Sequence, residues 1–298
     1  MSSTLLISHP KYSWRDWVKA NTTKGDLVML DPANTDFGAP CRVCLVRDGR
    51  VIAWRLTGAL DPQRNPLAWM NAAYFLLRLA EGDRTILFPS IRLSPVLRQM
   101  MIGMAQNIAA DRIVVPAGSR YEHQPWPIGA EVEELPEAFP VMVQEAQRRA
   151  RWLELFERST EHVVDLAKVG IEGARMGSGW RLKHADFSDW GEVSGGVLHV
   201  ITDRELEEDE VSRAMNLTHS NRLSIVRPDA YAGLVCSFGR QEGEDFGLGI
   251  IQSFDPEQNL MTIQADAVAP APVHLLRVGQ ERVDSNGRET GPVGLWAV

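Results

Sequence analysis

The chain has 298 residues, which is enough for two domains or one large domain with a real apolar core. Hydrophobic residues make up 44% and charged residues 23%, and these proportions exclude disordered, collagen-like and coiled-coil rod proteins. The formal charge of −8 means that most of the surface would repel a nucleic-acid backbone, so any such contact must use a local basic patch.

Short apolar runs alternate with amphipathic stretches in the first half of the chain. They predict a strand over 4–8, a helix containing Trp14 and Val18, a strand over 26–30, a hairpin over 41–54, a helix over 66–79, a strand over 85–88, a helix over 94–109 and a strand over 112–115. Strands that are apolar throughout and separated by such helices predict an α/β fold with a mostly parallel sheet and helices on both faces.

Ligands of such sheets bind at the carboxyl ends of the strands. Three of these ends are recognisable here, at Ser8-His9-Pro10, Asp31-Pro32 and Pro89-Ser90. We therefore expect a site formed by these segments.

The second half of the chain begins with a long helix after Pro140 and continues with shorter strands. On this helix an apolar stripe recurs every three or four residues and is predicted to be buried: Met142, Ala146, Ala150, Leu153 and Phe156. Strands are predicted over 163–167, 197–201, 231–238, 247–251, 260–263 and 273–276. The sequence thus predicts an α/β domain over 1–157 and a smaller β-rich domain over 158–298.

Another face of the long helix is basic. If the chain binds nucleic acid, we expect contacts from Arg148, Arg149, Arg151 and Arg158, with an exposed Trp152 beside them. The alternative is a solvated face on which neighbouring glutamates balance the arginines.

Three cysteines exclude a secreted disulfide framework. Cys41 and Cys44 form a C-x-x-C pair, but both lie in a predicted strand rather than at a helix N-terminus, so we expect buried core thiols. The seven histidines are scattered, and no metal site is expected. Gly177-Ser178-Gly179 does not open a helix after a strand, so it does not predict dinucleotide binding.

The apolar run over 4–8 is too short for a signal peptide, and no run approaches the ~20 residues of a membrane span. We expect a cytoplasmic protein with no membrane partner.

One stretch is more specific than the rest. Asp31-Pro32-Ala33-Asn34-Thr35-Asp36-Phe37-Gly38-Ala39-Pro40 resembles the D-P-G-Q-P-E-F-x-P-P segment of the RNA 5′-hydroxyl polynucleotide kinase family. Gly247-Leu248-Gly249-Ile250-Ile251 is similar to that family's C-terminal L-G-L-G-I-V pattern. The family includes the kinase-like subunit of the pre-mRNA cleavage machinery. The resemblance implies a P-loop-NTPase-like domain followed by a C-terminal domain, with Arg148 to Arg151 in the place of an arginine-rich lid helix.

The same resemblance aligns His9-Pro10-Lys11-Tyr12-Ser13-Trp14-Arg15-Asp16 with the phosphate loop, G-P-x-x-S-G-K-[ST]. A phosphate cradle needs glycines that turn backbone N–H groups inward, a lysine for the β- and γ-phosphates and a hydroxyl for Mg²⁺. Here His9 and Trp14 replace the glycines, Arg15 the lysine and Asp16 the hydroxyl. In the second-strand segment, Asp31 remains of the family's paired acids and Met29 takes the other position, Asn34 replaces the glutamine, and Asp36 stands in the acid–aromatic pair. The T-x-G-W motif is missing around Pro89-Ser90-Ile91.

Phosphoryl transfer depends on positioning and charge stabilisation, so these losses favour a protein without catalysis. We expect a pseudokinase that acts as a scaffold or as an RNA- or protein-binding module and needs no cofactor. The alternative is an active ATP-dependent 5′-hydroxyl kinase with Mg²⁺, in which Arg15 is the phosphate cation and Asp16 or Asp31 holds the metal. A third alternative is an unrelated α/β protein.

Overall fold

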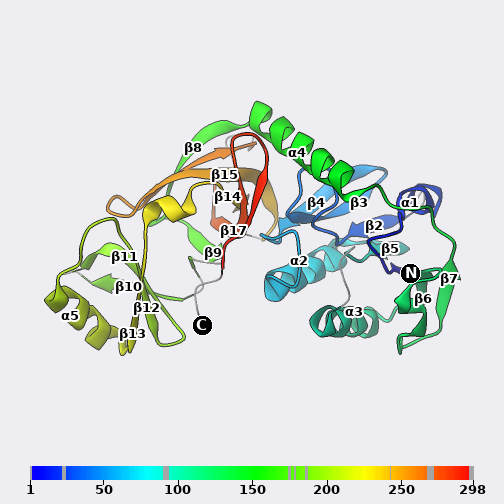
Figure 1. Cartoon of the computed structure of the whole chain (residues 1–298), viewed down its shortest axis with the longest axis horizontal. Coiled ribbons are helices and arrows are strands. Elements are labelled where there is room, and N and C mark those ends of the chain that lie inside the picture. Colours follow the sequence, from blue (N-terminus) through cyan, green and yellow to red (C-terminus); the bar gives the residue numbers. More distant parts are fainter. Residues whose placement is uncertain are drawn as a thin grey trace. The chain divides into compact units, whose positions relative to one another are not determined.

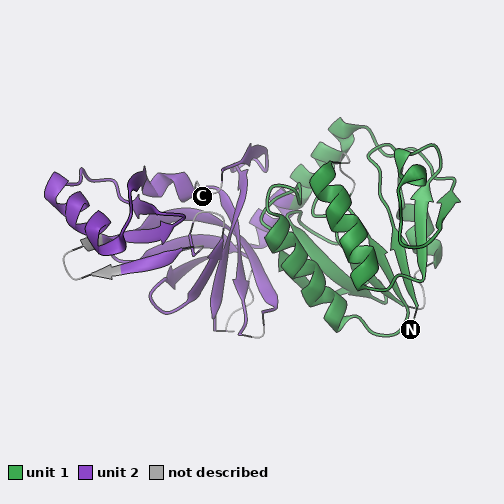
Figure 2. Cartoon of the chain, turned by 90° about the horizontal axis from the view of Figure 1, so that it is seen from below, with its two compact units in different colours: residues 1–151 green, residues 152–298 purple. Residues whose placement is uncertain are grey.

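The computed structural model describes residues 2–21, 25–89, 94–173, 176–177, 179–184, 187–241, 243–266 and 272–294. The chain folds as two compact units, residues 1–151 and 152–298 (Figure 2). Both this division and the boundary predicted after residue 157 fall within helix α4, Val141–Arg158.

Unit 1 is built on one sheet whose described strands run in the order β4-β3-β2-β5-β1-β6-β7 (Figure 1). Their bounds are β1 Ser3–Leu6, β2 Asp26–Met29, β3 Arg42–Arg47, β4 Arg50–Leu56, β5 Arg84–Leu87, β6 Arg112–Pro116 and β7 Ala130–Glu133. From β2 to β7 all neighbours are parallel, whereas β3 and β4 form the predicted antiparallel hairpin. The expected mixed α/β architecture with a mostly parallel sheet is confirmed.

Helices cover both faces of this sheet. They are α1 Arg15–Asn21, α2 Pro66–Leu79 and α3 Pro95–Asn107, with a short 3₁₀ helix, η1, at Arg120–His123. α3 begins where the sequence predicts, because the Ser94 hydroxyl accepts the Leu97 N–H at 3.1 Å and Pro95 occupies the first turn.

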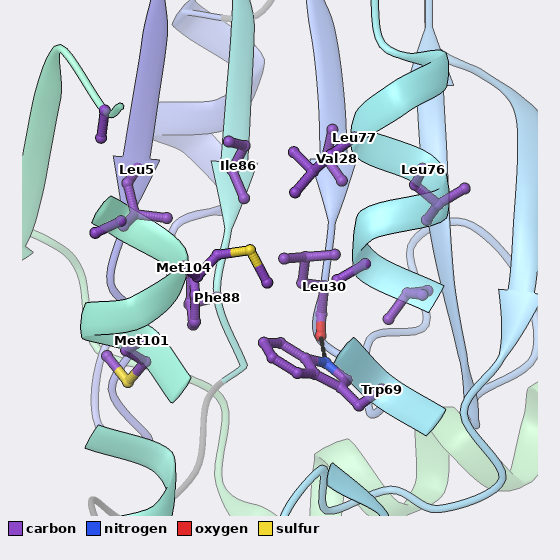
Figure 3. Close-up of a cluster of buried hydrophobic side chains, with 14 of the residues drawn as sticks. Leu5, Val28, Leu30, Trp69, Leu76, Leu77, Ile86, Phe88, Met101 and Met104 are labelled. Atoms are coloured by element: carbon purple, nitrogen blue, oxygen red, sulfur yellow. Dashed lines mark hydrogen bonds between the residues drawn. The ribbon is translucent and has the colours of Figure 1, made fainter. Parts of the chain in front are cut away.

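The α2 and α3 side of the sheet holds the larger core. Figure 3 shows side chains of β1, β2 and β5 packed beneath both helices, with the Trp69 indole N–H donating to the Leu30 carbonyl at 2.8 Å. On the other face, Trp14, just before α1, and Val18 of α1 pack in one cluster with Leu27 and Met29 of β2. Because α1 has only seven residues, part of this second face is left to line a cavity.

Unit 2 is β-rich, as the sequence predicts, and contains two described sheets. One sheet has the strand order β10-β11-β12-β13. The other has the order β18-β17-β14-β15-β16-β8, and β9 pairs with β17 at its side. Bounds are β8 Thr160–Asp165, β9 Gly170–Gly173, β10 Trp180–His184, β11 Phe187–Ser194, β12 Val197–Ile201, β13 Arg222–Val226, β14 Leu234–Gly239, β15 Asp245–Asp255, β16 Leu260–Ala265, β17 Leu275–Val283, β18 Glu289–Pro292, α5 Glu208–Thr218 and η2 Pro228–Tyr231.

Helix α4 corrects two expectations. Its apolar stripe is not buried: Met142 is 81% exposed and Leu153 37%. Trp152 was expected to be exposed, but it is fully buried and its indole N–H donates to a Glu289 carboxylate oxygen at 3.0 Å within unit 2. The spacing of apolar residues does not say which face packs, and here Trp152 and Leu155 do so.

A buried ion pair lies inside the larger sheet of unit 2. Arg277 of β17 pairs with Asp245 of β15, and both side chains are almost inaccessible to solvent. Asp245 also accepts the Ser237 hydroxyl at 3.0 Å. Glu172, which is half exposed, contacts Arg277 from β9 at 2.9 Å.

The three thiols, Cys41, Cys44 and Cys236, are buried and form no disulfide, which confirms the core interpretation of the C-x-x-C pair. Burial raises the pKa of Cys44 to about 12 and that of Cys236 further. We therefore expect native protein to react with Ellman's reagent only as fast as it opens, and all three thiols to react at once in denaturant. Rapid reaction of one thiol in native buffer would contradict this.

Candidate functional site

A cavity of about 760 Å³ opens at the carboxyl ends of β1 and β2 and runs along the sheet face beside α1; we call it the strand-end cavity. Several sequence-predicted residues meet in it: Ser13, Trp14, Arg15, Asp31, Asn34 and Asp36. They come from the loop that follows β1, the first residue of α1 and the loop that follows β2. The structure thus brings these residues to one cavity, as expected from parallel strands whose carboxyl ends lie at the same edge of a sheet.

The loop over residues 8–14 contains a turn, and several of its N–H groups donate to acceptors in the chain itself. The Tyr12 N–H donates to the His9 carbonyl at 3.0 Å, and the Lys11 N–H donates to His9 Nδ1 at 3.2 Å. The Arg15 N–H is directed to the Ser13 hydroxyl at 3.4 Å. A phosphate cradle needs such N–H groups turned toward the ligand.

A segment at residues 136–138, which we call the strap, lies along this loop. The Ser13 N–H donates to the Pro136 carbonyl at 2.9 Å, and the Ala138 N–H donates to the Lys11 carbonyl at 2.9 Å. Tyr12 and Glu137 thus form an antiparallel bridge. Through the strap, the loop becomes part of a small piece of sheet.

Trp14 occupies the inner side of the loop. Its side chain is 4% exposed, its indole N–H donates to the Ile7 carbonyl at 3.1 Å, and Trp17 packs edge-on at 5.6 Å between ring centroids. Its backbone carbonyl accepts the Val18 N–H at 2.8 Å, so α1 starts directly from this residue. The indole therefore holds β1 and α1 together.

Several charged and polar side chains of the cavity have partners within the protein. The Arg15 guanidinium forms an ion pair with Asp36 and lies 5.7 Å from the Phe139 ring centroid. Asp31 is buried, and its carboxylate accepts the Ala33 N–H at 3.0 Å, which sets the turn after β2. The Asn34 side chain caps the next turn by accepting the Asp36 N–H at 2.9 Å.

Other predicted residues lie elsewhere. Asp16 is exposed on the first turn of α1 and does not line the cavity, and His9 lines a separate cavity. Pro10 is exposed and borders neither. Ser90 and Ile91, where the T-x-G-W motif was sought, lie outside the described residues, as does Ser178 of the Gly-x-Gly segment.

The four predicted arginines all lie on α4 and none lines the strand-end cavity. Arg151 donates to the Thr35 carbonyl at 2.9 Å, and Arg158 donates to the Glu154 carbonyl at 3.1 Å. Arg149 and Arg158 are exposed, whereas Arg148 and Arg151 are half-buried.

Sequence reasoning missed other polar side chains of the cavity, among them Lys19, Gln144 and Gln147. Lys19 follows Arg15 by four residues, and the two glutamines are three apart, so each pair shares a helix face. That spacing was visible, but it does not show which helix face borders a cavity.

Within the described part of the chain, no group of three or more His, Cys, Asp or Glu side chains is arranged to hold a metal ion. Nor does any described helix combine the length and apolar character needed to cross a membrane.

Comparison with known proteins shows which fold the chain has but does not assign it to a family. No protein-family model matches the chain, and no curated protein matches it by sequence. Among solved structures, the chain is similar to a structure of Clp1p with Pcf11p that concerns ATP loss in a glycine-to-arginine point mutant. The TM-score is 0.56 at 10% sequence identity, and the match covers 94% of this chain and 74% of that chain. A wild-type Clp1p–Pcf11p complex gives a TM-score of 0.56 at 9% identity with the same coverage. Both units of this chain thus share a fold with these structures.

Proposed function

We propose that this chain is a polynucleotide-kinase-like protein that transfers no phosphate and serves as a binding module for a protein or RNA partner. The observation that carries the proposal is the state of the loop over residues 8–14. Its N–H groups at Lys11, Tyr12 and Ser13 already have acceptors in the chain, and the Trp14 indole fills its inner side. A triphosphate would have to displace all of these contacts.

The charges of the strand-end cavity support the same conclusion. Its lining contains two cations, Arg15 and Lys19, against three carboxylates, Asp31, Asp36 and Asp48. Arg15 is already paired with Asp36. A polyanion placed here would meet a local excess of negative charge, which raises the cost of binding.

The solved structures suggest the kind of role. In both, Clp1p is bound to another protein, Pcf11p, and one concerns a point mutant that has lost ATP. A fold of this type thus serves in a protein complex, and one large side chain in place of a glycine accompanies loss of the nucleotide there. The present chain carries such side chains at two loop positions, His9 and Trp14.

Calorimetric titration with ATP and MgCl₂ tests the proposal. We expect no saturable heat at ligand concentrations well above those that fill a working nucleotide site, and identical traces for the wild type and the Arg15→Ala and Asp31→Asn variants. Micromolar binding that either substitution abolishes would reject the proposal.

One observation favours the alternative, an active 5′-hydroxyl kinase: Arg15 and Asp31 do share a cavity of ligand size. The calorimetry above should be run together with transfer of labelled γ-phosphate to 5′-hydroxyl RNA and DNA oligonucleotides. Transfer that depends on Arg15 and Asp31 would establish the alternative, and its absence with both substrates would reject it.

A further inference from the structure

A second cavity of about 490 Å³ lies between the loop after β1 and the loop after β6; we call it the His9 cavity. It is lined by His9, Lys11, Tyr12, Gly118, Ser119, Arg120, Glu122 and His123. It shares only Tyr12 with the strand-end cavity, and its chemistry differs from that of the first.

Basic groups dominate its wall. Lys11 and Arg120 are exposed cations, and His123 is a third nitrogen base at the same rim. Burial and the charges of Lys11 and Arg120 lower the pKa of His9, so both cations lie near that ring at the same cavity. An anion in the cavity would relieve this crowding of like charge.

The imidazole of His9 lines the cavity and can act as a hydrogen-bond donor. Its Nδ1 accepts the Lys11 N–H at 3.2 Å, so in the neutral ring the proton resides on Nε2. The ring is held between Tyr12 and Tyr121, at 5.5 and 5.8 Å between centroids. A fixed N–H donor beside two cations is suited to an oxyanion.

Two polar atoms of the wall are buried and have no partner in the described protein: the Ser119 hydroxyl oxygen and Oε1 of Glu122. Ser119 as a whole is only 5% exposed. A buried polar group without a partner is unfavourable, and a ligand with hydroxyl groups would supply one. A glutamate oxygen can only accept when ionised, so the ligand must bring a hydroxyl or amino donor as well as an anion.

We propose that the His9 cavity binds a small phosphate monoester that carries hydroxyl groups, such as a sugar phosphate. The phosphate faces Lys11, Arg120 and His9, and the hydroxyls meet Glu122 and Ser119. A small ligand is favoured over a polynucleotide at this site because the two cations line one cavity of about 490 Å³, which is the size of a compact ligand. The site is independent of whether the strand-end cavity binds ATP.

The test is titration of the wild-type chain with ribose 5-phosphate, inorganic phosphate and unphosphorylated ribose, without ATP or magnesium. We expect saturable binding of ribose 5-phosphate, weaker binding of inorganic phosphate and none of ribose. Lys11→Ala and Arg120→Ala should each weaken ribose 5-phosphate about tenfold or more. Arg15→Ala and Lys19→Ala, in the other cavity, are matched controls and should leave its affinity unchanged.

The Glu122→Gln variant separates the two halves of the proposed ligand. It should weaken ribose 5-phosphate relative to inorganic phosphate, because only the sugar contacts Glu122. Equal affinity for the two probes, with no effect of Glu122→Gln on their ratio, would overturn the assignment of a hydroxylated ester. Absence of saturable binding, or indifference to Lys11→Ala and Arg120→Ala, would overturn the site. Tighter binding of a 5′-phosphorylated RNA oligonucleotide than of ribose 5-phosphate would overturn the choice of a small ligand.

Discussion

Replacing Asp245 by alanine is expected to destabilise unit 2 by about 3–5 kcal/mol, because it leaves the buried Arg277 guanidinium without its buried counter-charge. Glu172 still contacts Arg277, but it is half exposed and cannot replace an enclosed carboxylate. The Ser237 hydroxyl loses its acceptor at the same time. Urea denaturation followed by circular dichroism measures the loss in the free energy of unfolding.

A double variant distinguishes an uncompensated charge from lost packing. Asp245→Ala combined with Arg277→Met removes both charges, and we expect it to recover at least half of the lost stability. Asp229→Ala is the matched control, because this carboxylate is well exposed and its nearest arginine nitrogen, on Arg227, is 4.0 Å away. A double variant as unstable as the sum of the single ones would show that the pair is not coupled in this way.

The Trp14→Ala variant is expected to lose about 3–5 kcal/mol in the stability of unit 1, the range for deleting a buried tryptophan from a core. The indole fills the space between β1 and α1, and its N–H bond to the Ile7 carbonyl is lost with it. We also expect the variant to gain no ATP binding, because the strap still holds the Ser13 N–H. Thermal denaturation and the ATP titration check the two parts.

Trp180→Ala is the control for this variant, since that side chain is 64% exposed and its removal should change stability by less than about 0.5 kcal/mol. A Trp14→Ala protein of unchanged stability would mean that the indole does not hold the loop. Saturable ATP binding by it would mean that the indole alone closes the nucleotide site.

The architecture of unit 1 could be predicted from the sequence because its signals are local. Asp48-Gly49 marks the hairpin turn, and Ser94-Pro95 marks the start of α3. β7 was missed because its residues are mostly polar and half or fully exposed, so no apolar run signals it. In unit 2, β9 is a short strand of four residues, two of them glycines, and local propensity gives little indication of it.

The candidate site was predictable only as far as chain order determines it. Arg15 and Asp31 meet because both follow parallel strands of one sheet, as the alternation of strands and helices indicates. The strap was not predictable, because its contacts with the loop join residues more than 120 positions apart in the sequence. α4 shows the same limit, since two faces carry apolar residues and only packing chooses between them.

The strap also leads directly into Pro140 and the first turn of α4, where the Val143 N–H donates to the Pro140 carbonyl at 2.9 Å. A displacement of the start of α4 would therefore act on the loop after β1 through two backbone hydrogen bonds, from the Ser13 N–H to the Pro136 carbonyl and from the Ala138 N–H to the Lys11 carbonyl. Amide hydrogen exchange at Ser13 and Ala138 should rise and fall together, since neither proton can reach solvent until the same small ladder opens. A partner that binds the start of α4 would thus change how often these two hydrogen bonds open.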